Sequence, residues 1–316
     1  MSTTKTIADF SLLKKLCSIH APSGDEGAMT RFVLDYVRKN KKNWKVQPEI
    51  HAGKDFQDGI ILVFGKPRTA VFAHMDSIGY TAAYDRQLVR IGGPVPGDGD
   101  VLVGTDSKGK IECELMVIDH HDGSRSLEYI FKRPIDRGTS LTFKPIWRNS
   151  KDHIQCCYMD NRLGVWTALK LAETLEDGAI VFSTYEEHSG GTVGFYAKFL
   201  REKYGVQQAL IADITWVTRG VKHGKGVAIS MRDSGIPRQS YVRNIIALAE
   251  KSKIPFQLEV ESAGGSDGTA IQKSDTLMDW CFIGAPEDHV HSPHEIVHKK
   301  DIASMLNMYR YLMKHL

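Results

Sequence analysis

The sequence predicts an α/β protein in which a central β-sheet is flanked by helices and is interrupted by a small β-rich domain. Three observations support this fold class. Two helical patterns precede the first strand, and short apolar runs alternate with helical patterns from Gly59 onward. Between about Ser77 and about Cys157, β-branched and aromatic runs with turn signals replace the helical periodicity. We therefore expect helices on both faces of one sheet and a β module inserted into it.

The first two helices are predicted by apolar residues at helical spacing in residues 7–19 and 30–39. Ser23 is followed three residues later by Glu26, a pattern typical of a capping box, so it predicts where the second helix begins. The apolar runs at 60–64 and 70–73 predict the first two buried strands.

After residue 157 the alternation of helices and strands is regular, as in a layered α/β domain. We expect helices at 163–175, 193–203, 241–251, 268–273 and 301–315, and strands at 179–185, 208–213, 256–260 and 278–283. Trp166, Trp216 and Trp280 are predicted to be core residues rather than residues of a binding pocket.

The predicted insertion divides the chain into two domains. Residues 1–77 and 158–316 form a discontinuous α/β domain in this prediction, and residues 78–157 form the β-rich domain, with strands at 111–118, 127–131 and 141–146. The glycine-rich residues 92–100 predict a plain turn. A phosphate-binding loop is disfavoured because no Gly-Lys-Ser/Thr follows and no helix begins there.

Composition limits the classes of partner. With 42% hydrophobic residues, 316 residues can bury a substantial core, and the net charge of +3, from 41 basic and 38 acidic residues, predicts neither a nucleic-acid nor a membrane partner. No run approaches the roughly 20 apolar residues of a membrane span, and no signal peptide is evident, so we expect a cytoplasmic protein. The five cysteines lack Cys-x-x-Cys spacing and predict reduced, buried residues; for Cys281, packing is favoured over a nucleophilic role.

Several residues that can bind metal stand where predicted strands end. His74, Glu186 and Asp213 each follow a buried apolar run. Sites in open α/β sheets form beyond the carboxyl ends of the strands, so we expect these side chains to lie close together.

The residue types fit a pair of divalent cations, which need one shared carboxylate and terminal nitrogen or oxygen donors on each side. Asp160, just before a predicted helix, is the expected bridging ligand. Asp76, two residues after His74, is expected to hold the imidazole in one tautomer rather than to bind metal. Zinc is the expected ion, with cobalt and manganese as alternatives.

The adjacent Glu186 and Glu187 can serve one site only if their strand ends there, which Gly190 and Gly191 favour. One glutamate would bind metal and the other would act as general base, and their order is open on these grounds. In the histidine-rich tract at 288–298, His291 is preferred over His289 as a ligand because Ser-Pro follows it.

At this point the chain resembles the tetrahedral-type aminopeptidases, the glutamyl and leucyl aminopeptidase-like group of dinuclear metallopeptidases. The matching blocks occur in the order of that family: His74-Met-Asp-Ser-Ile-Gly, Asp160-Asn-Arg-Leu-Gly, Glu186-Glu187, Asp213, Gly264-Gly-Ser-Asp-Gly-Thr-Ala and His291-Ser-Pro. The resemblance implies a central mixed sheet, a barrel-like inserted domain, peptide substrates and a homo-oligomer built from dimers.

The resemblance also implies the roles of the site residues. One ion would be bound by His74, Asp160 and Asp213, the other by Asp160, Glu187 and His291, with Glu186 as the base. Three alternatives remain at this stage: a metal-dependent carboxypeptidase, an N-deacylase on the same frame, and a non-catalytic binding protein that retains the fold. For the polar loop at 232–235, a surface turn is favoured over substrate contact.

Overall fold

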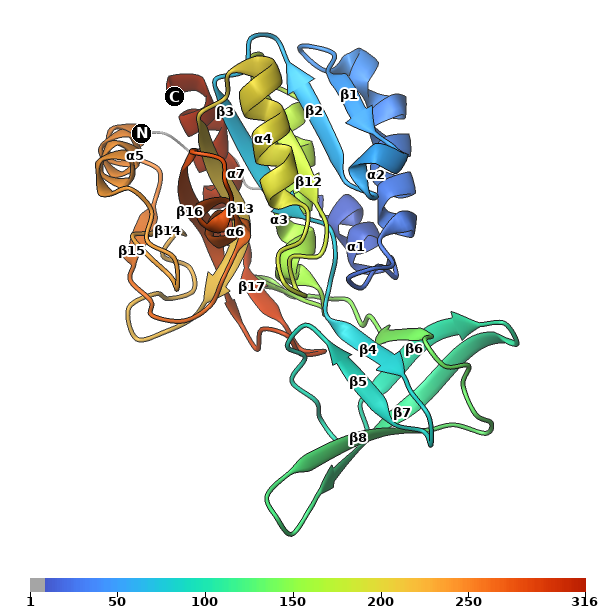
Figure 1. Cartoon of the computed structure of the whole chain (residues 1–316). Coiled ribbons are helices and arrows are strands. Elements are labelled where there is room, and N and C mark those ends of the chain that lie inside the picture. The colour runs from blue at the N-terminus through green and yellow to red at the C-terminus, as the bar shows by residue number, and fades with distance from the viewer. Residues whose placement is uncertain (1–8) are drawn as a thin grey trace.

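The computed structural model of the protein describes residues 9–316, which form two β-sheets (Figure 1). The larger sheet has 11 strands. Its main path runs β1 (Glu49–Ala52), β2 (Ile60–Phe64), β12 (Gly178–Ser183), β3 (Thr69–His74), β13 (Gln208–Trp216), β16 (Asp279–Asp288), β17 (Ile296–His298), β11 (His153–Gln155) and β10 (Arg148–Asn149). β14 (Val227–Ser230) pairs with β16, and β15 (Phe256–Glu259) pairs with β14.

The centre of this sheet is parallel and its flanks are antiparallel. β12, β3, β13 and β16 run parallel to one another, whereas β2 and β17 are antiparallel to their neighbours β12 and β16. The predicted mixed sheet is therefore confirmed. Because the four central strands share one direction, their carboxyl ends lie at the same edge of the sheet.

Helices cover both faces of the larger sheet, as predicted. The strand β2 shows why, because its side chains alternate between two apolar clusters. Ile60, Leu62 and Phe64 belong to the first cluster, and Ile61 and Val63 belong to the second. The first cluster contains α1 (Ser11–Cys17), α2 (Gly27–Asn40), α3 (Met159–Ala172), α5 (Gln239–Ser252) and α7 (Lys299–His315), and the second contains α4 (Val193–Tyr204) and α6 (Asp267–Lys273).

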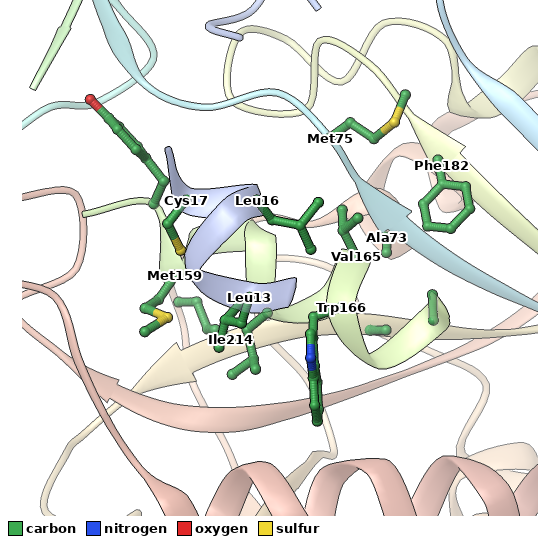
Figure 2. Close-up of a cluster of buried hydrophobic side chains, with 14 of the residues drawn as sticks. Leu13, Leu16, Cys17, Ala73, Met75, Met159, Val165, Trp166, Phe182 and Ile214 are labelled. Carbon is green, nitrogen blue, oxygen red and sulfur yellow. The ribbon is translucent and has the colours of Figure 1, made fainter. Parts of the chain in front are cut away.

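Part of the first cluster lies between α1, α3 and the central strands, where Leu13, Trp166 and Phe182 are fully or almost fully buried (Figure 2). Trp166 and Trp280 are core residues, as predicted. All five cysteines are buried and unpaired, also as predicted.

Two short 3-10 helices, η1 (Lys41–Asn43) and η2 (Lys54–Phe56), flank β1. Among residues 9–316, no helix is long and apolar enough to cross a membrane.

The second sheet consists of six antiparallel strands and lies apart from the helical layers (Figure 1). Its order is β5 (Leu88–Ile91), β4 (Gly79–Ala82), β9 (Ser140–Phe143), β6 (Val101–Asp106), β7 (Gly109–Asp119) and β8 (Arg125–Ile130). The isolated bridge between Gln87 and Glu128 brings the two edge strands together. The sheet is therefore nearly closed, which confirms its barrel-like character.

Two details concern the predicted boundaries. β10 and β11 fall within the expected 78–157 domain, but they pair with the larger sheet through β17. The division into two domains stays a prediction. Residues 7 and 8 of the first predicted helix lie outside the described residues, and the described helix begins at Ser11.

The predicted capping box is wrong. Helix α2 begins at Gly27, and no side chain caps it. Ser23 Oγ instead donates to Asp76 Oδ2 over 2.6 Å, and Glu26 Oε1 accepts the amide of Tyr185 over 3.2 Å. The Ser23 hydroxyl donates to the charged acceptor Asp76 instead of accepting a helix amide, so Ser23 is held at the segment that follows β3 rather than at the helix.

Candidate metal centre

His74 is the last residue of β3, and four carboxylates, those of Asp76, Asp160, Glu186 and Asp213, lie within 4 Å of its buried ring. Its Nε2 atom lies 3.2 Å from Asp160 Oδ1 and 3.6 Å from Asp213 Oδ2, while Nδ1 lies 3.4 Å from Asp76 Oδ1. Asp213 reaches the ring from β13, the strand that pairs with β3 in parallel. His74 and Asp213 thus lie together as expected, although β13 continues to Trp216, beyond the predicted end of that strand at Asp213.

Asp160 is held at the start of α3 by the residues that follow it. Asn161 Nδ2 donates to Ala212 O, and Asn161 Oδ1 accepts from Gly164 N, both over 2.8 Å. A Cβ atom at Gly164 would lie 2.1 Å from Ala212 O, so only glycine lets α3 pack this closely against β13. Arg162, fully buried, donates to the backbone carbonyls of Met75 and Asp76. These contacts fix Asp160 between the ends of β3 and β13.

The two carboxylate oxygens of Asp160 face different imidazoles. Oδ1 lies 3.2 Å from His74 Nε2, and Oδ2 lies 3.3 Å from His291 Nε2. His291 Nε2 is also 3.2 Å from Glu187 Oε2. Asp160 is therefore common to two groups of potential ligands, one with His74 and Asp213 and one with Glu187 and His291.

The adjacent glutamates reach one site because β12 ends at Ser183, before them and earlier than predicted. Tyr185 adopts a left-handed conformation with φ of 63°, and its carbonyl accepts the amide of Gly190. Asp76 then holds both glutamate amides, with Oδ1 accepting from Glu186 N and Oδ2 from Glu187 N, each over 3.1 Å. Asp76 thus contacts the His74 ring and positions the glutamates without belonging to either group of potential ligands.

His291, rather than His289, faces Asp160. His289 is exposed and belongs to neither group of potential ligands among the described residues. The ring of His291 is held from its other side, because Nδ1 lies 3.1 Å from the carbonyl oxygen of Gly93. The carbonyl accepts a hydrogen bond from a protonated Nδ1, which leaves the lone pair of Nε2 free to bind metal.

The loop that begins at Gly92 was not predicted to take part in the site. Gly92 has φ of 68°, and a Cβ there would lie 3.0 Å from Glu187 O. Gly93 contacts His291 as described, and Val95 N donates to His291 O over 2.9 Å. The glycine-rich run is therefore a turn, as predicted, but one that packs against Glu187 and His291. Its glycines were the only signal in the sequence.

Two buried glutamates also escaped the sequence prediction. Glu295 Oε2 accepts the amide of Asp160 over 3.3 Å, while neither carboxylate oxygen of Glu287 has a hydrogen-bond partner among the described residues. Burial raises the pKa of both groups well above the usual range, and repulsion by Glu295 adds to this effect for Glu287 and by Asp160 for Glu295. Nothing in the sequence around either residue distinguishes it from a strand or loop glutamate.

The electrostatics of the cluster favour bound cations. Burial raises the pKa of Glu187 and of Asp213 to about 7, and neighbouring carboxylates add to both effects. For His291, burial alone would lower the pKa, but the carboxylates of Glu187 and Asp160 raise it to about 12. Without cations the cluster thus retains protons, and protons and metal ions compete for such groups.

The residues present fit two divalent ions. Within each group of three, the potential ligand atoms all lie within 4.8 Å of one another. The donor set combines imidazole nitrogen with carboxylate oxygen, and Glu187 Oε1 is buried without a partner. Such mixed donors suit zinc, cobalt or manganese.

A cavity of about 290 Å³ adjoins the cluster. Asp160, Glu186, Glu187, Asp213 and His291 line one part of it. Trp216 lines it as well and is 38% exposed, so the prediction that this residue belongs to the core is wrong. The reason is that Trp216 is the last residue of β13, three residues beyond Asp213, where the strand runs past the helical layers.

Comparisons with known proteins identify the family and the fold of the chain. The sequence model of the M42 glutamyl aminopeptidase family matches residues 96–308. A protein of Acetivibrio thermocellus named "Putative aminopeptidase" is 27% identical over 329 residues, which cover 95% of this chain and 96% of that protein.

Solved structures show the same fold. An aminopeptidase from the archaeon Desulfurococcus kamchatkensis superposes with a TM-score of 0.84 at 21% identity, over 97% of this chain and 94% of that one. The TET1 peptidase of Pyrococcus horikoshii, which can assemble into a tetrahedron or a large octahedral shell, gives a TM-score of 0.78 at 21% identity, over 96% and 98%. The resemblance to tetrahedral-type aminopeptidases is confirmed. The chain belongs to the M42 glutamyl aminopeptidase family and is a peptide hydrolase.

Proposed function

We propose that the protein is a dinuclear metal-dependent aminopeptidase that removes N-terminal residues from peptides. The position of Asp160 carries this proposal, because each of its oxygens faces the imidazole of a separate ligand group. A carboxylate shared in this way is what a pair of divalent ions requires. The matching family and the fold support the reaction class.

In this proposal His74, Asp160 and Asp213 hold one ion, and Asp160, Glu187 and His291 hold the other. Zinc is the expected ion, with cobalt and manganese as alternatives. When bound, the ions would polarise the scissile carbonyl and make a nearby water more acidic.

Glu186 is the proposed general base. It lines the same cavity but belongs to neither ligand group, and its Oε2 atom lies 3.8 Å from His74 Nε2. Burial, followed by the charges of Asp213 and Glu187, raises the pKa of Glu186 well above the usual range, despite the opposing effect of His74. A carboxylate with a raised pKa can take the proton of the attacking water and return it to the leaving amine.

The test is hydrolysis of amino-acid anilides and short peptides after removal of metal with a chelator and reloading with zinc, cobalt or manganese. Glu186→Gln should lower kcat by about 100-fold or more while the protein still binds metal. The matched control is Glu202→Gln, which changes an exposed residue of α4. Equal rates for Glu186→Gln and the parent protein would remove Glu186 as the base.

A blocked substrate separates an aminopeptidase from an N-deacylase or carboxypeptidase on the same frame. An aminopeptidase binds a free α-amine, so acetylating the N-terminus of the peptide should abolish turnover. Turnover that survives acetylation would instead support one of those alternatives, which the family and its relatives do not favour.

We further propose that the protein assembles into a homo-oligomer built from dimers. The proposal is supported by the similarity to the TET1 peptidase of P. horikoshii, which forms large closed shells. Light scattering after size-exclusion chromatography would measure the assembly directly, and a monomer at micromolar concentration would contradict it. The cytoplasmic location stays a prediction from the sequence.

A further inference from the structure

The cavity beside the metal centre has a second wall, formed by the loops that follow β14 and β15. Asp233 lies in the first loop, Glu259 ends β15, and Glu261 lies just beyond it; all three line the cavity. The loops are hydrogen-bonded to each other, because Glu261 N donates to Arg232 O over 3.0 Å and Ser234 N donates to Gly264 O over 3.3 Å. The polar loop at 232–235 is therefore part of a built cavity wall.

Within residues 9–316, these three carboxylates form no ion pair. No lysine or arginine lines the cavity in the described part of the chain, and no basic nitrogen of residues 9–316 lies within 4 Å of a carboxylate oxygen of Asp233, Glu259 or Glu261. A buried carboxylate usually acquires a positive partner. Here that partner can come only from outside this wall.

Glu259 is the most deeply buried of the three, with 3% of its surface exposed. Thr215 Oγ1 donates to its Oε1 atom, and no donor of good hydrogen-bond geometry contacts Oε2 in the described residues. Burial, opposed in part by Thr215 and reinforced by the charges of Glu261 and Asp233, raises the pKa of Glu259. A cation in the cavity would relieve both the burial and the repulsion.

The charges of the proposed metal centre do not offset this wall. Two divalent ions would balance the four carboxylates at their own end of the cavity: Asp160, Glu186, Glu187 and Asp213. The three carboxylates of the second wall would still have no cationic partner among the described residues, although Asp233 accepts hydrogen bonds from Gly235 N, Thr269 Oγ1 and Ser266 Oγ. The excess negative charge therefore lies on the second wall of the cavity, away from the proposed metal ions.

Apolar side chains connect the two ends. Ile214, Phe282 and Trp216 line the cavity together with the carboxylates. Trp216 packs beneath Gly264, where a Cβ atom would lie 3.2 Å from the indole ring. A hydrocarbon chain that ends in a positive charge matches this surface, because its methylenes can lie along the apolar residues while its head reaches the carboxylates.

We propose that this pocket binds the side chain of a basic N-terminal residue, so that the enzyme prefers peptides that begin with lysine or arginine. The proposal rests on the proposed aminopeptidase function and names its substrate class. An N-terminal glutamate, the residue in the name of the matching family, would place its carboxylate against Asp233, Glu259 and Glu261, with no lysine or arginine among the described lining residues, and is disfavoured.

The test compares kcat/KM of the metal-loaded protein for anilides of lysine, arginine, norleucine and glutamate. Norleucine has a similar unbranched hydrocarbon chain without the charge. Lysine should exceed norleucine by roughly 30-fold, the effect typical of a desolvated charge pair, and glutamate should be the poorest substrate. Norleucine or glutamate at least as good as lysine would overturn the proposal.

Variants separate recognition of charge from a structural role. Glu261→Gln, at a partly exposed position, should lower the ratio of lysine to norleucine kcat/KM by about tenfold, and Glu261→Lys should also raise glutamate relative to lysine. The control Glu202→Gln should leave the ratio at the parent value. An unchanged ratio in both Glu261 variants would contradict the assignment.

A binding measurement tests the specificity of the pocket independently of hydrolysis. If no anilide is hydrolysed under any metal, the aminopeptidase function fails, and calorimetry of lysinamide against norleucinamide still tests the pocket. Lysinamide should bind the metal-loaded protein at least about tenfold more tightly, and Glu261→Gln should reduce this difference. Equal affinities would overturn the proposal even if the protein hydrolyses peptides.

Discussion

Asp76 connects three parts of the candidate metal centre through one carboxylate. Its oxygens accept hydrogen bonds from Ser23 and from the amides of Glu186 and Glu187, and Oδ1 lies 3.4 Å from the His74 ring. In a His-x-Asp pair such as His74 and Asp76, the carboxylate is usually taken to orient the histidine alone. Here the same carboxylate also sets the turn that brings two adjacent glutamates into one cavity.

Asp76→Asn should therefore weaken metal binding without unfolding the protein. The amide NH₂ cannot accept, so one glutamate amide or the His74 ring loses its partner. We expect affinity for zinc to fall by about 10–100-fold, as for other residues that orient metal ligands. Titration against a competing chelator measures this, with Asp55→Asn, at an exposed position, as the control. Parent affinity in Asp76→Asn would show that the carboxylate charge is dispensable.

Glu26 should make the stability of the ion-free protein depend on pH. Burial, and then the nearby charge of Asp76, raises the pKa of Glu26 to about 7, whereas a glutamate in an unfolded chain has a pKa of about 4.3. Between these values the folded state binds more protons, so the free energy of unfolding falls as pH rises and stays lower above about pH 7.

Glu26→Gln has no such proton to lose. In chelator, the decrease in unfolding free energy from about pH 5 to about pH 8 should be smaller in Glu26→Gln than in the parent by about 2–3 kcal/mol. Urea denaturation at the two pH values measures the difference. The same decrease in both proteins would mean that Glu26 is ionised in the folded state.

At the scale of elements, the close contact between α3 and β13 depends on Gly164, which has no side chain. Gly164→Ala would place a Cβ 2.1 Å from Ala212 O, so the helix must move away from the strand. We expect a loss of stability of about 2–3 kcal/mol, in the range of other overpacked cores. Gly220→Ala, where a Cβ meets nothing within 4 Å, is the control and should change stability by less than about 0.5 kcal/mol. Equal stabilities of the two variants would contradict this packing.

The sequence predicted elements best where they are buried on both faces. The strand at 60–64 was predicted with its observed bounds, because a continuous apolar run lies between Gly59 and Gly65. The strand β1 was not predicted, since it lies at a sheet edge and contains polar as well as apolar residues. The short strands β10, β11 and β17 have too few residues to show an alternating pattern in the sequence. They are recognised as strands only because they pair with neighbouring strands.

The candidate site was predictable to the extent that its residues stand at strand ends. His74 and Asp213 follow apolar runs, and parallel pairing of β3 and β13 brings them together. The contacts of Gly92 and Gly93 depend on how the second sheet lies against the first, which no local pattern records. The capping box failed for the same reason, because Asp76, 53 positions away in the chain, competes for Ser23.

At the scale of the whole molecule, the candidate metal centre lies where the two sheets meet. The loop after β5 of the second sheet contacts Glu187 and His291, which belong to one ligand group, and does not supply any contact to His74 or Asp213 among the described hydrogen bonds. The two ligand groups should therefore respond differently to a change in this loop.

Gly92→Ala should weaken only one of the two ion sites. Its Cβ would lie 3.0 Å from Glu187 O, at a φ of 68° that alanine rarely adopts. We expect the variant to bind one zinc ion tightly and the second at least about tenfold more weakly than the parent. Gly99→Ala is the matched control, because Gly99 also has a positive φ, 81°, but a Cβ there meets nothing within 4 Å. Equal weakening of both sites would contradict a selective role for the loop.

The central claim is that Asp160 holds a pair of divalent ions between two imidazoles. Anomalous diffraction from zinc-loaded crystals tests it most directly. The account predicts two peaks about 3.5–4 Å apart, each about 2.0–2.2 Å from an Asp160 oxygen, with His74 and Asp213 at one peak and Glu187 and His291 at the other. Two peaks that do not share Asp160, or none beside it, would contradict the account.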